Sequence, residues 1–562
     1  MHSLRTQFAA ATLVVLLALG GHSLAQSMNR QVGTQFTVTA EPLVPRPSEQ
    51  PCKVQLFTDY QFAFFSESNQ IFQYAPPANC PGPWAAVVFE ADFSENAGSQ
   101  FDRTASLYLA NTNLYFGTTP EPLFTDTNTW HVERDVTDYS ALLTAPQPGT
   151  MVLPNCTTDC PPPYNTLNGV FTVSADLEFY PLQGTGPVRP DAVLPLVQSN
   201  GNGGVNLPGF VYSPTDQLTT TFTLPTNVEQ AYLDVVTQGQ QSDEFWYTCV
   251  PDTLTTELQS CGGTAFREAE ISVDGQPAGV APVYPWVFTG GIDPFLWVPI
   301  PGVQTLDLMP YRVNLTPFAG LLSNGQPHTV AMNVLNVNSQ FSVTGTLLLF
   351  EDHGSTQVTG EITANTIKSP NPVVTTNLHV NGSNVKGTVR TTSQRQFQIA
   401  GFVNTSHGKV KTIVQQSVNF SNEQGFKITP TVYVQDISQL TPANSTVTTQ
   451  GNGGSVSTES FLDPLTMGIN VTFPNGDTVE TTTVQQEFKH IVANPSYSGS
   501  VDNLVNAKDS VNFNTGVNTG ARSSQQYTFG DSMGQFYTCG IASQSNILKA
   551  VSSGCKQTIK FK

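Results

Sequence analysis

Charged residues are scarce in this sequence of 562 residues, and basic residues are scarcer than acidic ones. Asp, Glu, Lys and Arg make up 12% of the chain, and 42 acidic against 23 basic residues give a formal net charge of -19. A chain this acidic is a poor ligand for nucleic acids and for anionic membrane surfaces. We therefore expect neither partner. Low charge with much Ser, Thr, Asn and Gln favours an extracellular protein.

Long apolar runs are absent after the first 25 residues. Residues 1–25 begin with basic side chains, continue with an apolar run from Phe8 to Leu19, and end with small side chains at Ser23 and Ala25. The run is too short to span a bilayer, and this order of features is typical of a cleaved secretory signal. The sequence therefore predicts a signal peptide over 1–25, a secreted or periplasmic protein, and no transmembrane segment.

Two common signatures of catalysis, the HExxH metalloprotease motif and the Walker A phosphate loop, are also missing. Only eight histidines are present, and two of them lie in the predicted signal segment. We interpret the other six, which stand far apart, as ordinary surface or core histidines: His131, His328, His353, His379, His407 and His490. We expect no metal ion and no organic cofactor.

Eight cysteines, all after the predicted signal segment, predict a disulfide framework, because an even number in an oxidising compartment is usually paired. Their spacings do not match zinc sites, and paired thiols cannot act as nucleophiles. They occur as near neighbours, and we expect sequential pairing: Cys52 with Cys80, Cys156 with Cys160, Cys249 with Cys261, and Cys539 with Cys555.

Long amphipathic helical patterns are missing, and alternation with period two takes their place. Apolar residues alternate with other types in Phe171–Tyr180, and the pattern recurs in Phe341–Leu349. The pairs Asn381-Gly382 and Asn475-Gly476 are typical of tight turns between strands. The sequence therefore predicts an all-β protein made of antiparallel sandwiches.

Composition divides the rest of the chain into three parts. A first unit spans 51–180 and ends before a Gly-, Pro- and Asn-rich connector, 181–204. A second unit spans 205–353. The part from 354 to 562 is rich in Thr, Val, Asn and Gln, and we expect a C-terminal β-rich domain there. Its role stays open between glycan binding, covering of sheet edges and attachment to a surface.

Carboxylates and tryptophans of the first two units are the best candidates for chemistry. Carboxylates with exposed aromatic rings are typical of carbohydrate sites, because rings stack on sugars and acids bond hydroxyls or move protons. The candidates are Asp102, Glu121, Glu133, Glu244, Glu268, Asp274 and Asp293, with Trp130, Trp246, Trp286 and Trp297. The alternative is that the tryptophans belong to the sandwich cores.

Asp102 and Arg103 stand where a Ser-, Asn- and Gly-rich loop, 94–99, meets the strand-like run Thr104–Leu109. Such a junction gives a side chain both exposure and rigid support, which suits a catalytic group. A structural salt bridge or a turn-stabilising aspartate is the alternative for this pair.

Several segments, in one order along the chain, resemble the peptide:N-glycosidases of the plant and fungal type A group and their acid-active bacterial relatives. In the first unit these are QFDR with TASLYLAN, TTPEP, Trp130 and ERDVTDYSALL. In the second unit they are DEFWYTCVPD, FREAEISVDG, TGGIDPFLW and NLTPFAG. The Asp-Arg pair and LPTNVEQAYL are distantly similar to the bacterial F-type enzyme. The resemblance covers 51–353.

The resemblance implies two jelly-roll-like sandwiches side by side, with an active site in the cleft between them. It implies hydrolysis of the amide bond at a glycosylated asparagine of an N-glycopeptide or N-glycoprotein. The asparagine becomes aspartate, and the glycan leaves as a glycosylamine that loses ammonia. From the resemblance and the acidic composition we expect activity at acid pH, and we expect a monomer.

The resemblance also implies roles for particular residues. Asp102 corresponds to the essential acid of the F-type enzyme and would activate or orient water, while Arg103 would hold the oxyanion or Asp102. Glu244 would hold the first GlcNAc, share the water or donate a proton. A further F-type acid would fall near 153–155, where no carboxylate stands. We expect substrate contacts from four more residues: Trp246, Trp130, Trp297 and Glu268.

Two other functions fit the same residues. A glycoside hydrolase cleaving the chitobiose core through two carboxylates would leave one GlcNAc on the peptide. A non-catalytic, lectin-like adhesin would need only the sandwiches and exposed aromatic rings. The peptide product distinguishes the first function from an amidase, and turnover itself distinguishes the second.

Overall fold

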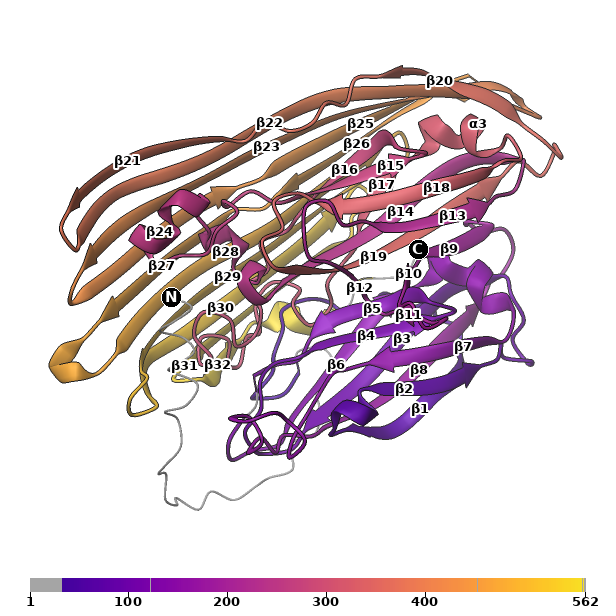
Figure 1. The fold of residues 1–562 in the computed structure, drawn as a ribbon. Helices are drawn as coiled ribbons and strands as arrows, with labels where there is room; N and C mark the ends of the chain where they lie inside the picture. The colour runs from indigo at the N-terminus through magenta and orange to yellow at the C-terminus, as the bar shows by residue number, and fades with distance from the viewer. Residues whose placement is uncertain (1–32, 122, 452, 558, 560–562) are drawn as a thin grey trace.

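The computed structural model describes residues 33–121, 123–451, 453–557 and 559, so the predicted signal peptide over 1–25 lies outside the described residues. Antiparallel strands make up nearly all of the regular structure (Figure 1). No helix among the described residues is both long and apolar enough to cross a membrane. The predicted all-β class is confirmed.

The first unit is a sandwich of two four-stranded sheets. One sheet has the strand order β1-β8-β3-β6 and the other β2-β7-β4-β5, so the chain changes sheet at most connections, as in a jelly roll. Its strands are β1 (Cys52–Phe62), β2 (Asn69–Tyr74), β3 (Trp84–Glu95), β4 (Thr104–Leu109), β5 (Thr112–Thr118), β6 (Asn128–Asp135), β7 (Gln147–Val152) and β8 (Phe171–Pro181).

The second unit repeats this connectivity. One sheet has the order β12-β19-β14-β17, with β9 also on β19, and the other has β13-β18-β15-β16, while β10 pairs with β11. If β12 to β19 are matched in chain order to β1 to β8, both sheets of the second unit have the strand orders of the first unit. The strands are β9 (Ala192–Leu196), β10 (Gln198–Ser199), β11 (Val205–Asn206), β12 (Gly209–Val211), β13 (Leu218–Thr223), β14 (Val228–Gln240), β15 (Glu268–Val273), β16 (Gln276–Pro282), β17 (Tyr311–Asn314), β18 (Pro327–Val334) and β19 (Gln340–Glu351). Two jelly rolls were expected, and two are present.

The two sandwiches lie side by side. Their contact explains why buried apolar residues stand on both faces of β19 and do not simply alternate with polar ones. Leu347 and Leu349 are buried in the core of the second unit, as predicted. Leu348 points to the opposite face, yet it is also buried, because it packs with Val193 in the apolar cluster of the first unit. The outer face of this strand is therefore the interface between the sandwiches.

The C-terminal part forms a single antiparallel sheet of 13 strands. The main order of its strands is β20-β22-β23-β24-β27-β28-β29-β30-β31-β32, and β21, β25 and β26 pair with strands of this series. The strands are β20 (Thr359–Asn365), β21 (Val373–Asn381), β22 (Asn384–Thr405), β23 (Gly408–Thr429), β24 (Val432–Leu440), β25 (Pro442–Gln450), β26 (Ser455–Leu462), β27 (Leu465–Thr472), β28 (Val479–Asn494), β29 (Tyr497–Asn512), β30 (Val517–Asp531), β31 (Phe536–Gln544) and β32 (Ile547–Val551).

One face of this large sheet packs on the second unit, over which it arches (Figure 1). Glutamine side chains on that face satisfy backbone carbonyls of second-unit loops. Gln424 Nε2 donates to the carbonyl of Cys249 at 2.8 Å, and Gln486 Nε2 donates to that of Pro285 at 2.7 Å. Long-range hydrogen bonds from the C-terminal sheet thus hold loops of the second unit in place.

Short helical segments and disulfides complete the fold. All four predicted disulfides are present, in the sequential pairing. The helical segments are η1 (Phe65–Glu67), η2 (Thr137–Thr144), η3 (Gln241–Asp243), η4 (Trp246–Thr248), η5 (Asp252–Leu254), α2 (Thr255–Leu258), η6 (Thr316–Phe318), α3 (Ala319–Leu322), η7 (Pro474–Gly476) and η8 (Ser553–Lys556).

Candidate functional site

The Asp102-Arg103 pair lies between β3 and β4, and its backbone is bound to the chain that follows β5. Arg103 N donates to Thr119 Oγ1 at 2.8 Å, and Thr119 N donates to Arg103 O at 2.8 Å. Asp102 N donates to Glu121 Oε2 at 3.3 Å. Since β4 and β5 form a hairpin, its open end carries Asp102 and Glu121 next to each other.

Gly290, from the loop between β16 and β17 of the second unit, lies directly against both carboxylates. A Cβ atom at Gly290 would stand 2.3 Å from Glu121 Oε2 and 2.8 Å from Asp102 Oδ1. Its φ of +73° is also in the region that favours glycine. The neighbouring Thr289 Oγ1 donates a hydrogen bond to Thr119 O, which fastens this loop to the first unit. The second unit therefore completes the site.

Glu244 joins the site from the second unit, just after β14. The adjacent Asp243 is fully buried and accepts hydrogen bonds from Arg267 Nη2 at 2.7 Å and Ser339 N at 2.6 Å, which fixes the position of the loop. Below it, Thr104 Oγ1 donates to Gln238 Oε1 at 3.0 Å and ties β4 to β14. The charges of Glu244 and Arg103 both shift the pKa of the Asp102 carboxyl, so these three side chains lie close together.

Glu95, at the end of β3, is a fourth acid beside these residues. Its side chain is 1% exposed, and neither carboxyl oxygen accepts a hydrogen bond from a described residue. The nearby Arg103 donates from Nη2 to Gln100 Oε1 at 2.6 Å. We call Glu95, Asp102, Glu121 and Glu244 the carboxylate cluster. The local sequence alone predicts neither the position of Glu95 beside the site nor the contact between Glu121 and Asp102.

Three members of the carboxylate cluster, Glu95, Asp102 and Glu121, hold protons well above the pH at which free carboxyls lose them. Burial raises the pKa of Glu95 to about 9 and that of Glu121 to about 8. Burial first, and then the charges of Glu121 and Glu244, raise the pKa of Asp102 well above its ordinary value. The guanidinium of Arg103 opposes these shifts. Since several carboxyls share this one guanidinium, an ionised and a protonated carboxyl can coexist here, as acid-base catalysis requires.

Stability should fall as the pH rises above the acid range. Four acids in desolvated surroundings keep their protons in the folded protein up to pKa values of about 7 to 9: Glu41, Glu95, Glu121 and Asp293. Above their ordinary pKa values of about 4 the unfolded chain gives up these protons but the folded protein does not, so rising pH favours unfolding. We expect the melting temperature at pH 8 to lie more than about 5 °C below that at pH 5.

Calorimetric melts at the two pH values measure this difference. Asp293→Asn should reduce it, because the buried Oδ2 of Asp293 accepts no hydrogen bond from a described residue and its pKa is raised by burial to about 8. An equal or higher melting temperature at pH 8 in the unaltered protein would contradict the expectation.

The three tryptophans expected to contact sugar are core residues. Trp130 is 1% exposed and stacks on Phe93 with ring centroids 5.1 Å apart, and Trp246 and Trp297 are each 2% exposed. A buried ring offers no face to a sugar. This burial corrects the expectation and agrees with the alternative that the tryptophans form sandwich core.

Glu268 is likewise not part of the site. Its side chain is buried, and it forms an ion pair with Arg395 of the C-terminal sheet. The pair joins β15 to β22, so Glu268 holds the large sheet on the second unit. The expected substrate contact by Glu268 is therefore also corrected.

Exposed aromatic rings do lie beside the carboxylate cluster, but they are Phe rings, one of which contacts the partly buried Tyr164. Phe101, next to Asp102, is 40% exposed and meets Tyr164 edge to face with centroids 5.6 Å apart. The Arg103 guanidinium lies 5.7 Å from the Phe101 ring centroid. Phe124, three residues after Glu121, is 64% exposed. The sequence signal for these rings was Phe101, an aromatic residue that directly precedes the Asp-Arg pair.

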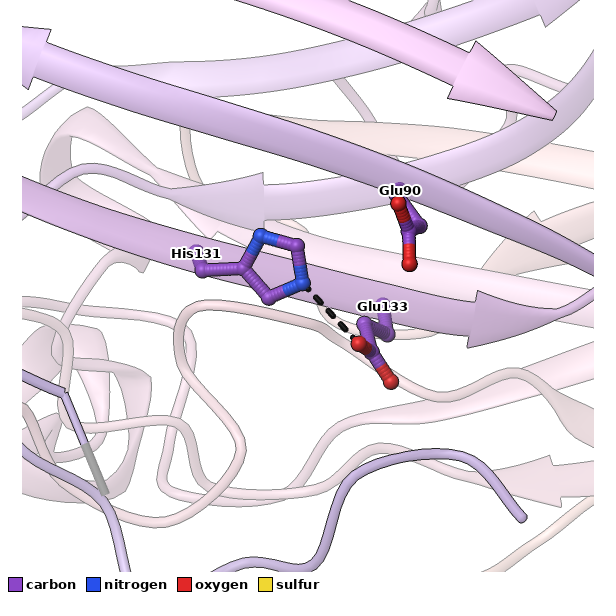
Figure 2. Close-up of side chains that lie close together, drawn as sticks. All are labelled: Glu90, His131 and Glu133. Atoms are coloured by element: carbon purple, nitrogen blue, oxygen red, sulfur yellow. Dashed lines mark hydrogen bonds and ion pairs between the residues drawn. The ribbon is translucent and has the colours of Figure 1, made fainter. Parts of the chain in front are cut away.

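Two of the other candidate acids pair with histidines away from the site, Glu133 with His131 and Asp274 with His328. His131 Nε2 lies 3.0 Å from Glu133 Oε1 (Figure 2). Its Nδ1 lies 2.7 Å from Asp92 Oδ1. Glu90, His131 and Glu133 are close enough together to hold a metal ion. Arg46 already supplies the cation, because its guanidinium pairs with Glu90 at 2.5 Å and with Glu133 at 2.7 Å. This group is a salt-bridge network that fixes the N-terminal segment.

A Gly-x-Ser-x-Gly pattern, Gly530–Gly534, also occurs in the sequence. In hydrolases this pattern forms a sharp strand-to-helix turn that exposes a nucleophilic serine. Here it lies at the turn between β30 and β31, two strands of one hairpin. The pattern is therefore a hairpin turn and adds no second candidate site.

Comparison with known proteins agrees with this picture. The model of the family "Peptide N-acetyl-beta-D-glucosaminyl asparaginase amidase A" matches residues 42–368. The chain is 29% identical over 408 residues to a peptide-N4-(N-acetyl-beta-glucosaminyl)asparagine amidase A of Prunus dulcis, an alignment covering 69% of either chain.

Two solved structures are more remotely similar. The glycosylasparaginase PNGase F of Flavobacterium meningosepticum aligns at 14% identity and a TM-score of 0.37, covering 54% of this chain and 96% of the other. PNGF-II aligns at 14% identity and a TM-score of 0.38, covering 54% and 66%. No argument about the site rests on these two. The family model spans more than half of the chain, so this protein belongs to the peptide N-acetyl-β-D-glucosaminyl asparaginase amidase A family.

Proposed function

We propose that the protein is a secreted amidase that hydrolyses the β-aspartylglucosaminyl amide bond of N-glycopeptides or N-glycoproteins. It converts the glycosylated asparagine to aspartate and releases the glycan as a glycosylamine. The observation that carries the proposal is the carboxylate cluster, in which Asp102 and Glu121 of one sandwich meet Glu244 and Gly290 of the other. Family membership supports the same reaction class.

Amide hydrolysis needs a base for water, a positive group for the oxyanion and an acid for the leaving nitrogen. Burial and the neighbouring acids raise the pKa of Asp102, and the guanidinium of Arg103 opposes them by favouring loss of the proton. We assign Asp102, once it has lost its proton, to activating water. Arg103 then stabilises the oxyanion. Glu121 has its pKa raised to about 8 and carries a proton at acid pH, so we assign it to the leaving nitrogen. Glu121 thereby takes the third acid role that the sequence leaves unassigned.

The sugar is held by residues on both sides of the cluster. We assign Glu244, which the second unit contributes to the cluster, to hydrogen bonds with hydroxyls of the first GlcNAc. Phe101, which is exposed, and Tyr164, which is partly buried and meets it edge to face, lie beside Asp102, and aromatic rings stack on sugar faces. We propose that these two rings replace the buried tryptophans as the sugar contacts.

The products of a defined N-glycopeptide at acid pH test the proposal. An amidase yields the aspartate-containing peptide and free ammonia. A glycosidase leaves one GlcNAc on the peptide, and a lectin leaves the glycopeptide unchanged. Mass spectrometry of the peptide, with an ammonia assay on the same sample, separates the three outcomes. Either of the last two would refute the proposal.

A further inference from the structure

A small cavity lies where the second unit meets the C-terminal sheet, and none of its lining residues belongs to the carboxylate cluster. Its volume is about 60 Å³. One water occupies about 30 Å³ in the liquid, so the cavity suits a group of a few atoms and not a sugar ring. Met309, at its edge, is 48% exposed, which leaves the cavity open to solvent on that side.

Aromatic rings surround this cavity. Tyr284 contacts Trp286 with ring centroids 4.5 Å apart and Phe488 at 5.9 Å. Phe461 contacts Phe488 at 6.1 Å and Tyr311 at 5.0 Å. All of these contacts are tilted or edge to face, so these rings do not stack flat on one another. Ring faces attract cations, most strongly when water is excluded.

Asp463 supplies the one carboxylate in the lining of the cavity. It is 4% exposed, and its Oδ1 accepts no hydrogen bond from any described residue. Of the nearby phenols, Tyr284 Oη donates to Glu487 O at 3.2 Å and Tyr311 Oη accepts from Gln416 Nε2 at 3.0 Å, and neither donates to Asp463 Oδ1. Burying a carboxyl without a partner costs free energy, and native proteins usually satisfy such groups. A ligand in the cavity would supply the missing donor.

We propose that these five rings and Asp463 form a cage that binds a primary alkylammonium group. The ammonium donates to Asp463 while its methylene groups lie against the rings, which is the combination by which aromatic cages recognise organic cations. A lysine side chain of a polypeptide and a free amine share this chemistry. The inference concerns a site separate from the proposed amidase site and does not depend on it.

Binding should release a proton. Burial raises the pKa of Asp463 well above its ordinary value of 3.8, so its carboxyl is protonated in the empty cage, and the ammonium takes the place of that proton. Affinity should therefore increase as the pH rises. The other titratable groups around the cage are Glu41, Glu268, Tyr284, Tyr311, Glu459, Glu487, Lys489 and His490.

Titration of the full-length protein with n-butylammonium chloride and with 1-pentanol, an uncharged alcohol one heavy atom longer, tests the proposal. Trp286 fluorescence reports occupancy, and calorimetry in two buffers of different ionisation enthalpy counts released protons. We expect saturable n-butylammonium binding, at least tenfold tighter than 1-pentanol, with about one proton released per cation. Nα-acetyl-lysine amide and its norleucine counterpart then show whether a lysine side chain also enters.

Asp463→Asn should weaken n-butylammonium binding at least tenfold and abolish proton release. Asp436→Asn, at an exposed acid of the same sheet, should change neither. Equal binding of n-butylammonium and 1-pentanol, no saturable binding, or an unchanged Asp463→Asn variant would each overturn the proposal. The comparison of the two ligands uses the unaltered protein, so it decides the question even if Asp463→Asn does not fold.

Discussion

The Glu121→Gln variant should fold normally and lose about 10²–10⁴-fold in kcat on an N-glycopeptide, the contribution typical of a positioned general acid. Glutamine keeps the acceptor oxygen that Asp102 N contacts at 3.3 Å, but it has no acidic proton to give to the leaving nitrogen. Burial raises the pKa of Glu121 to about 8, so activity that needs its proton declines as the pH rises through that region. The decline should be absent from the residual activity of the variant.

Steady-state kinetics from pH 4 to 9 measure both effects. Glu257→Gln, at an exposed acid of the second unit, is the matched control and should behave as the unaltered protein does. A Glu121→Gln variant with unchanged kcat, or with the same decline at high pH, would show that Glu121 is not the acid.

Gly290→Ala should lower activity by about 10²-fold or more, because displacements of about 1 Å at a catalytic centre have effects of that size. The new methyl group would stand 2.3 Å from Glu121 Oε2 and 2.8 Å from Asp102 Oδ1, so both carboxylates must move. The positive φ of +73° adds backbone strain of about 1–2 kcal/mol.

Gly275→Ala separates the collision from the strain. Gly275 has a φ of +74°, and nothing lies within 4 Å of the position of its Cβ. Both variants should therefore lose similar stability in chemical denaturation, while only Gly290→Ala loses activity. If the two variants retained equal activity on a glycopeptide, Gly290 would have no special place at the site.

The parts of the fold that follow from local pattern were predictable. Alternation with period two identifies strands because successive side chains point to opposite faces of a sheet. Near-neighbour cysteines, such as Cys249 and Cys261, pair as expected. The union of 13 strands into one sheet was not predictable, because the same strand-like sequences are compatible with many pairings.

The candidate site was predictable only where its residues are adjacent in the sequence or carried by the family resemblance. Asp102 and Arg103 stand together at a loop-to-strand junction. Glu121 reaches Asp102 through the β4-β5 hairpin, and Gly290 reaches it through the docking of two sandwiches. Composition could not tell that Trp130 and Trp246 are buried, since large aromatic residues occur both in cores and at binding sites.

Mass spectrometry of one defined N-glycopeptide at acid pH, treated with the protein and separately with its Asp102→Asn variant, tests the central claim most directly. Asp126→Asn, at an exposed acid of the first unit, is the matched control. The proposed site predicts conversion of the glycosylated asparagine to aspartate by the unaltered protein and by Asp126→Asn, but not by a folded Asp102→Asn variant. Equal conversion by all three would contradict the assignment of the site, and a folded protein that converts none of the peptide would contradict the amidase itself.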